Sequence, residues 1–130
     1  MDAVIVQDLG LAQVIHTVLP TLPLHASTQM SIYDTKQVKV LEKLGFTRVV
    51  LARELSIAQI QKIASRTSLE VEVFVHGALC VSVSGQCLMS AMIGERSANR
   101  GSCAQPCRMR YSLYQEKGKE VKSCSYLLSK

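Results

Sequence analysis

The segment "RVVLARELSIAQIQKIASRTSLEVEVFVH", residues 48–76, contains the strand–helix–strand pattern that decides the fold. It begins and ends with short apolar runs rich in valine, which are typical of buried strands. Between these runs isoleucines recur at helical spacing, and Ser56 and Gln59 have the spacing of a capping box at a helix start. The segment therefore predicts two parallel strands joined by a right-handed helical crossover.

The same pattern repeats through residues 1–79. Strand-like runs begin near residues 3, 23, 48 and 70, and the stretches between them carry apolar stripes at helical spacing. The first stripe consists of Leu11, Val14, Ile15 and Val18, and the second of Val38, Leu41 and Leu44, followed by Gly45 as a C-cap. An open doubly wound sheet and part of a (βα)8 barrel both fit this period. No G-x-G-x-x-G follows the first strand, so the sequence favours the α/β barrel.

A whole (βα)8 barrel takes about 250 residues, so four strands make a partial barrel. We expect the chain to be part of a longer protein, inactive by itself, with a partial parallel α/β barrel at residues 1–79. A cysteine-rich segment is expected at residues 80–108. A truncated β-hairpin with Gly118 in its turn is expected at residues 109–130. Open strand edges favour pairing with another chain, so we expect homo-oligomers or coverage of an edge by the C-terminal segment.

Composition restricts the class of protein. The hydrophobic content of 48% argues against disorder. No run approaches the roughly 18 apolar residues of a membrane span, and the acidic N-terminus is unlike a secretory signal, so a cytoplasmic location is expected.

Residues 1–79 carry seven basic and seven acidic residues, whereas residues 80–130 carry eight basic and three acidic ones. This basic excess fits either an RNA or small anionic partner, or a solvated surface.

Four of the five cysteines lie close together, at Cys80, Cys87, Cys103 and Cys107. In a reducing compartment such clusters are more often metal ligands than disulfides, because thiolates bind zinc and iron–sulfur clusters well. The spacing C-x6-C-x15-C-x3-C matches common zinc modules poorly and is compatible with an iron–sulfur cluster. Buried thiols and a catalytic cysteine remain open as alternatives. Cys124 is expected to be a small buried hydrophobe.

Polar residues gather where the predicted strands end, which is the catalytic face of a barrel. The catalytic candidates are His25, His76, Arg53 and Glu54. The candidates for substrate binding are Thr28, Gln29, Arg96 and Arg100. For each residue at a strand–helix joint taken alone, the sequence favours structural hydrogen bonding over a role in the site. A peptidase mechanism finds no support in the motifs, because H-E-x-x-H is absent and no carboxylate pair can be identified.

Two blocks, "EVFVHGALCVSVSGQCLMS" at residues 72–90 and "GERSANRGSCAQPCRMRY" at residues 94–111, resemble the collagenase-like proteases of peptidase family U-32, a bacterial family. "QDLG", "HASTQMSI" and "LGFTRVVLARELS" upstream are similar to that family as well, so the resemblance covers nearly the whole chain.

The resemblance implies one of two activities. One is the proteolysis of peptide substrates for which the family was named. The other is oxygen-independent hydroxylation of a tRNA uridine, a ribosomal RNA cytidine or the ubiquinone ring, with prephenate as the hydroxyl source. In the second case the resemblance implies a four-iron four-sulfur cluster on Cys80, Cys87, Cys103 and Cys107. A third hypothesis is a zinc-stapled binding module, in which zinc replaces the cluster in this chain.

Overall fold

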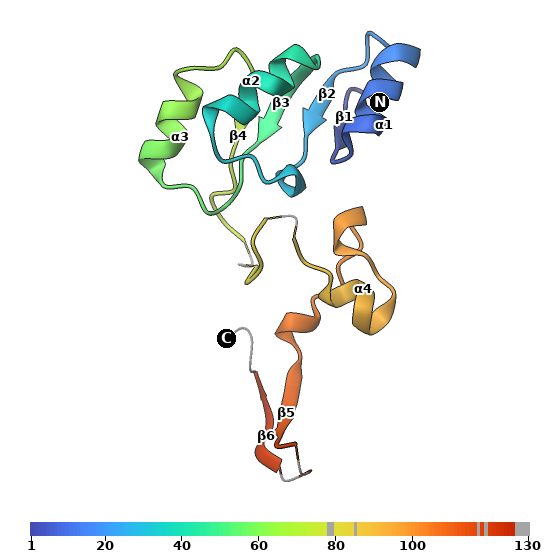
Figure 1. Cartoon of the computed structure of the whole chain (residues 1–130), viewed down its shortest axis with the longest axis vertical. Helices are drawn as coiled ribbons and strands as arrows, with labels where there is room; N and C mark the ends of the chain where they lie inside the picture. The colour runs from blue at the N-terminus through green and yellow to red at the C-terminus, as the bar shows by residue number, and fades with distance from the viewer. Residues whose placement is uncertain (78–79, 85, 117, 119, 127–130) are drawn as a thin grey trace. The chain divides into compact units, whose positions relative to one another are not determined.

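The computed structural model describes residues 1–77, 80–84, 86–116, 118 and 120–126 (Figure 1). The chain forms two compact units. The first unit comprises Met1–Ala78 and Val83–Gly85, and the second comprises Leu79–Ser82 and Gln86–Lys130. The division expected from the sequence, with breaks after residues 79 and 108, stays a prediction.

The first unit is built on a four-stranded parallel sheet with the order β1-β2-β3-β4. Its elements in chain order are β1 (Val4–Val6), α1 (Leu9–Val18), β2 (Leu24–Ala26), η1 (Thr28–Met30), α2 (Thr35–Lys43), β3 (Phe46–Val50), α3 (Ile57–Ala64) and β4 (Glu70–Glu72). Sequential order with right-handed crossovers places all connecting helices on one face of the sheet. The predicted α/β repeat with four parallel strands is confirmed, and the arrangement is consistent with part of a barrel.

Local hydrogen bonds define where each helix begins. The Asp8 carboxylate accepts the Leu11 N–H at 2.6 Å at the start of α1. The predicted capping box of Ser56 and Gln59 is confirmed at α3, and α2 begins with a second box. Gly45 follows the end of α2 with φ of +82°, a left-handed conformation that glycine adopts without a Cβ clash. The predicted stop of this helix is therefore confirmed.

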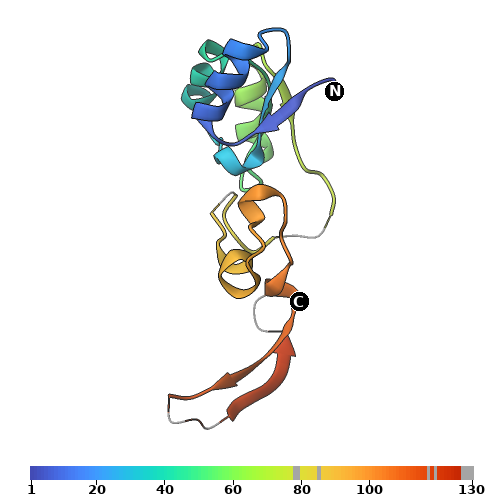
Figure 2. The same ribbon diagram turned by 90° about the vertical axis from the view of Figure 1, so that its right-hand side faces the viewer.

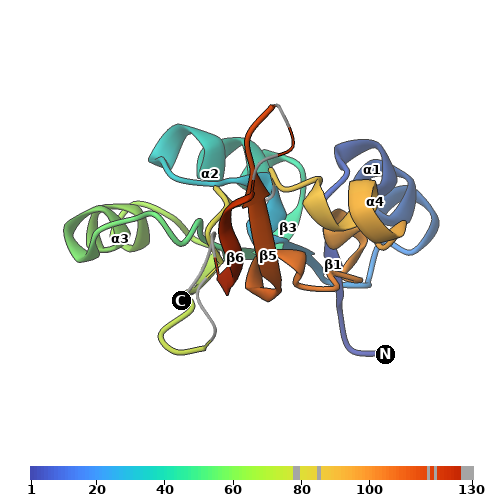
Figure 3. The ribbon, with the colours of Figure 1, turned by 90° about the horizontal axis from the view of Figure 1, so that it is seen from below.

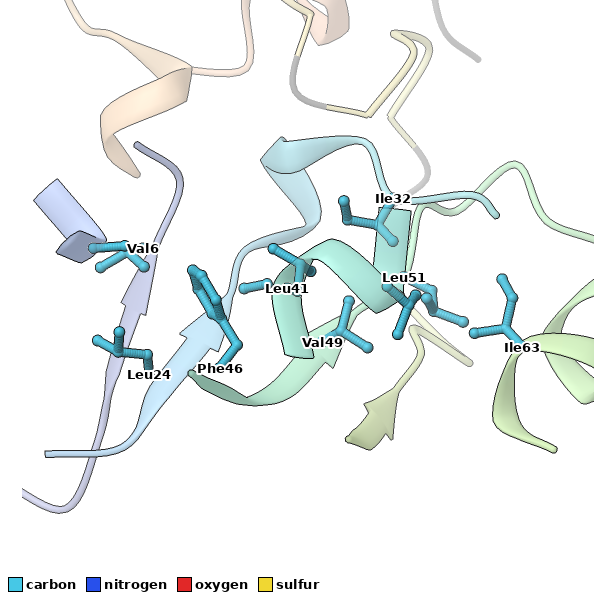
Figure 4. Packing of buried hydrophobic residues seen from close by; sticks show 11 residues of the cluster. Val6, Leu24, Ile32, Leu41, Phe46, Val49, Leu51 and Ile63 are labelled. Atoms are coloured by element: carbon cyan, nitrogen blue, oxygen red, sulfur yellow. The ribbon is translucent and has the colours of Figure 1, made fainter. Parts of the chain in front are cut away.

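One hydrophobic core lies between the sheet and its three helices. Leu24, Val49 and Leu51 are at most 1% exposed, and they share a cluster with residues of α1, α2 and α3. Figure 4 shows Leu41 of α2 beside Phe46 and Val49 of β3, with Leu51 toward Ile63 of α3. Burial of this apolar surface is the main stabilising contribution to the unit.

Two features of the first unit differ from expectation. On α1 the predicted stripe is mostly exposed, with Leu11, Val14 and Val18 in solvent and only Ala12 fully buried. The reason is that α1 flanks β1, which pairs only with β2 in the described sheet, so no further described strand is there for these side chains to pack against. The last strand was expected to reach His76, but β4 ends at Glu72.

The second unit has short elements: α4 (Met89–Gly94), η2 (Ala98–Arg100), η3 (Pro106–Arg108), β5 (Arg110–Tyr114) and β6 (Glu120–Tyr126). Strands β5 and β6 pair in antiparallel fashion and run side by side (Figure 2, Figure 3). Among the described residues of this unit, only Ser90 and Pro106 are buried. The residues of this unit that the structure describes therefore contribute nothing to the buried hydrophobic cluster.

Candidate functional site

The loops that follow β2 and β3 lie side by side at the carboxyl edge of the sheet. The Thr28 hydroxyl donates to the Leu51 carbonyl at 3.3 Å, and the Ala52 N–H donates to the Ile32 carbonyl at 2.9 Å. Thr28 and Gln29 both lie in η1. The structure therefore brings these two predicted substrate-binding residues to the same edge as Arg53 and Glu54, with Thr28 bonded to the backbone that leads to them.

Arg53 and Glu54 converge on a residue that sequence reasoning missed, Ser84. The Ser84 N–H donates to Glu54 Oε1 at 2.8 Å, and its hydroxyl donates to the same oxygen at 3.3 Å. The Ser84 hydroxyl oxygen accepts the Arg53 backbone N–H at 3.2 Å and the Arg53 Nε–H at 3.3 Å. The Ser31 hydroxyl donates to the Ser84 carbonyl. Backbone and side-chain polar groups of Ser84 are therefore all engaged.

This cluster acts on the charge of Glu54. Partial burial alone would raise the pKa of the Glu54 carboxyl. Hydrogen bonds from the Glu54 backbone N–H and from Ser84, together with the positive charge of Arg53, outweigh this effect, so the pKa of Glu54 is lowered. The carboxylate therefore stays ionised and accepts hydrogen bonds at neutral pH. Such a group is suited to holding a loop or a cation rather than to donating a proton.

The two histidine candidates do not join this cluster. His25 lies inside β2 between Leu24 and Ala26, both of which are buried against the helices. Because side chains alternate along a strand, His25 projects from the opposite face of the sheet, where it pairs in register with Arg48. His76 lies beyond the end of β4 and is exposed.

A charged network that was not singled out as a site lies on this opposite face. Arg48 contacts Glu70 Oε2 at 2.6 Å through Nη2 and Glu72 Oε2 at 3.4 Å through Nη1. The hydrogen bond to Glu70 is the main cause of a raised pKa for Arg48. Glu70 and Glu72 share a face of the sheet, because they flank Val71 in β4. The alternation of the two glutamates around Val71 is visible in the sequence and indicates that they lie on one face. No residue near Arg48 in the sequence indicates that it pairs with them.

The cysteine candidates are all free thiols in the second unit. Cys80 and Cys103 are exposed, and Cys87 and Cys107 are partly buried. Within the part of the chain that the structure describes, no three His, Cys, Asp or Glu side chains are arranged to hold a metal ion. The structure thus places the four cysteines in one unit without gathering their sulfur atoms. The side chain of Cys124 lies outside the described residues.

The donor set nevertheless fits an iron–sulfur cluster by its chemistry. Four thiols without disulfide partners supply the four soft anionic ligands that such a cluster takes. Cys103 Sγ already accepts the Gln105 N–H at 3.3 Å, the type of N–H···S bond that accompanies cluster ligands. Gln105 has φ of +56°, so the backbone turns sharply between Cys103 and Cys107.

The arginine candidates of the second unit are accessible. Arg96 follows α4 and Arg100 ends η2, and both are exposed. They lie in the stretch of chain between Cys87 and Cys103. Their guanidinium groups are therefore accessible to an anionic partner such as a phosphate.

No helix in the described ranges combines the length and the apolar character needed to cross a bilayer. Among solved structures, none matches this chain significantly.

Curated relatives are similar over most of this chain. It is 46% identical over 129 residues, 99% of its length, to the 23S rRNA 5-hydroxycytidine C2501 synthase of Escherichia coli (strain K12). It is 40% identical over 121 residues, 92% of its length, to the tRNA hydroxylation protein P of the same organism. It is 37% identical over 100 residues, 68% of its length, to a collagenase of Porphyromonas gingivalis (strain ATCC BAA-308 / W83). The chain spans only 19%, 27% and 24% of these relatives, respectively.

The family model described as peptidase family U32 matches residues 1–130. The resemblance expected from the cysteine blocks is therefore confirmed, and the chain belongs to peptidase family U32.

Proposed function

We propose that this chain is the part of an iron–sulfur-dependent, oxygen-independent RNA hydroxylase that carries the cluster ligands. Relatives named for rRNA and tRNA hydroxylation are 40–46% identical to it over nearly its whole length. The substrate in this proposal is a base of tRNA or rRNA. A small anionic substrate is the related possibility.

The observation that carries the proposal is the position of the thiols. Cys80, Cys87, Cys103 and Cys107 all belong to the unit whose described residues take no part in the buried hydrophobic cluster. Small units with little apolar core are commonly stabilised by disulfides or a bound metal centre, and the described residues of this unit show no such core. Free thiols in a reducing cytoplasm are available for that role.

In this proposal the four cysteines hold the cluster. When bound, a four-iron four-sulfur cluster supplies one-electron redox chemistry. The residues of the chain itself do the rest. Exposed Arg96 and Arg100 bind the phosphate backbone of the RNA, and the ionised Glu54 holds the strand-end loop in place. Self-association through the edges of β1 and β4 stays a prediction.

The test is anaerobic purification of the full chain, followed by iron, sulfide and zinc analysis. We expect a brown protein with iron and sulfide in equal amounts, and a colourless protein once the four cysteines are changed to serine. Colourless wild-type protein with stoichiometric zinc would support a zinc-stapled binding module instead.

The second candidate function is proteolysis, which the similarity to the collagenase favours. It is tested by incubating the chain, and its variant with the four cysteines changed to serine, with gelatin. Peptide-bond cleavage that survives loss of all four thiols would support the peptidase and contradict the hydroxylase proposal.

A further inference from the structure

Two serines in the cysteine-rich segment, residues 80–108, are fully buried, whereas most of the described residues around them are exposed or half-buried. Ser84 is 0% exposed and Ser90 is 1% exposed, and they are the only fully buried polar residues in the described part of the chain. Ser84 lies between Cys80 and Cys87, and Ser90 lies between Cys87 and Cys103. Buried hydroxyl groups are costly unless they are hydrogen-bonded, so their partners indicate what they are for.

Ser84 fixes the backbone between the first two cysteines. It lies four residues after Cys80 and three before Cys87, in the Val83–Gly85 segment that belongs to the first unit. Its N–H and hydroxyl are both bonded to Glu54, and its carbonyl accepts the Ser31 hydroxyl. These partners come from loops 30 and 53 residues away in sequence. The middle of the loop between Cys80 and Cys87 is therefore held at a defined place on the sheet edge.

Ser90 fixes the backbone between the last two cysteines. Its Oγ accepts the Ala104 N–H at 2.9 Å, and Ala104 directly follows Cys103. On the other side of this loop, the Tyr111 hydroxyl donates to the Pro106 carbonyl at 2.8 Å, and Pro106 directly precedes Cys107. The residues next to both cysteines are therefore held by hydrogen bonds of the protein itself.

We propose that Ser84 and Ser90 are positioning residues, each of which fixes the backbone of one cysteine pair for ligation. This inference rests on the proposed cluster. Hydrogen bonds around metal ligands set ligand orientation, and their loss typically weakens metal binding about 10- to 100-fold. The two anchors are independent, because Ser84 bonds to the first unit and Ser90 bonds within the second.

The experiment compares Ser84→Ala and Ser90→Ala with wild type after anaerobic reconstitution of the full chain with iron and sulfide. The matched control is Ser102→Ala, because Ser102 is exposed although it adjoins Cys103. We expect both test variants to lose iron to a chelator roughly 10- to 100-fold faster than wild type. We also expect an altered electron paramagnetic resonance spectrum of the reduced cluster, and the control should match wild type in both respects.

A second measurement does not depend on the cluster. Hydrogen exchange of the metal-free chain should show faster exchange of the Ala104 amide in Ser90→Ala and of the Arg53 amide in Ser84→Ala, because each of these N–H groups loses the hydroxyl oxygen that accepts it. Helices α2 and α3 should keep their protection in both variants, which shows that the first unit is folded. A spectrum and an iron-loss rate equal to those of wild type in both variants would overturn the inference. If wild type itself takes up no iron, the proposed function fails instead.

Discussion

The two units of this chain are stabilised in different ways. The first unit contains the whole buried hydrophobic cluster of the described chain, including Leu24, Val49 and Leu51. The second unit leaves Val81, Leu88 and Met92 more than half exposed. Hydrogen bonds at a few backbone positions hold it, including the bond from Ala104 to Ser90. The comparison shows that the apolar core of the described chain belongs to the sheet and its helices, whereas local hydrogen bonds are the contacts that hold the described cysteine segment.

The largest expected effect on the free energy of unfolding comes from truncating a leucine in the core of the first unit. The same truncation at an exposed leucine of the second unit is the matched comparison. Leu24→Ala should lower the free energy of unfolding by about 2–5 kcal/mol, because Leu24 is 1% exposed and its truncation leaves a cavity. Leu88→Ala, at an exposed site, should change it by no more than about 0.5 kcal/mol. Urea unfolding followed by circular dichroism measures both. Equal losses would contradict the difference between the units.

The next effect concerns the ligand dependence of the second unit. Cluster binding should slow hydrogen exchange in α4 and around η3 by roughly tenfold or more, because a ligand that binds only the folded form stabilises it. Amides of β2 and β3 should exchange at the same rate with and without the cluster. Mass spectrometry of the reconstituted and metal-free chains makes this comparison. Protection of α4 that is unchanged by metal would mean that the second unit is stable by itself.

A smaller effect is the acid sensitivity of the first unit. Glu42 of α2 accepts hydrogen bonds from Lys39, Thr67 and Ser68, and the bond from Lys39 contributes most to lowering its pKa from 4.5 to about 2. A carboxylate with a lowered pKa stabilises the fold above its unfolded-state pKa, and that contribution is lost as the pH falls through about 2.

Glu42→Gln should therefore reduce stability at neutral pH and flatten its decline in acid. Glu95→Gln is the matched control, because Glu95 is exposed and lies in the second unit. Urea unfolding at a series of pH values measures both variants. A decline in Glu42→Gln as steep as that of wild type would show that other carboxylates cause it.

The smallest effect is expected on the exposed face of the sheet. Arg48→Gln removes contacts to Glu70 and Glu72, whose side chains are 68% and 48% exposed. Exposed ion pairs contribute little because water screens them and ordering the side chains costs entropy. The variant should differ slightly from wild type at low salt and not at all at about 1 M salt, where the screening length is about 3 Å. A large loss that persists in high salt would indicate that Arg48 has a structural role beyond its charge.

The sequence by itself determined the repeating part of the fold. Apolar periodicity, the capping box at Ser56 and the glycine at Gly45 are signals within a few residues of one another, and they predicted the four parallel strands and their helices. The cysteine blocks likewise indicated the family. Each of these signals is local, so it can be read along the chain without knowledge of contacts.

Only the tertiary structure decided which polar residues are fixed by hydrogen bonds and which apolar residues stay exposed to solvent. Ser84 gave no sequence signal, because its partners Ser31 and Glu54 lie 53 and 30 residues away. The apolar stripe of α1 predicted a buried face, but burial requires a neighbouring strand, and the described sheet has none beyond β1. Hydrogen-bond partners and burial are properties of chain segments brought together by folding, and for that reason local patterns do not reveal them.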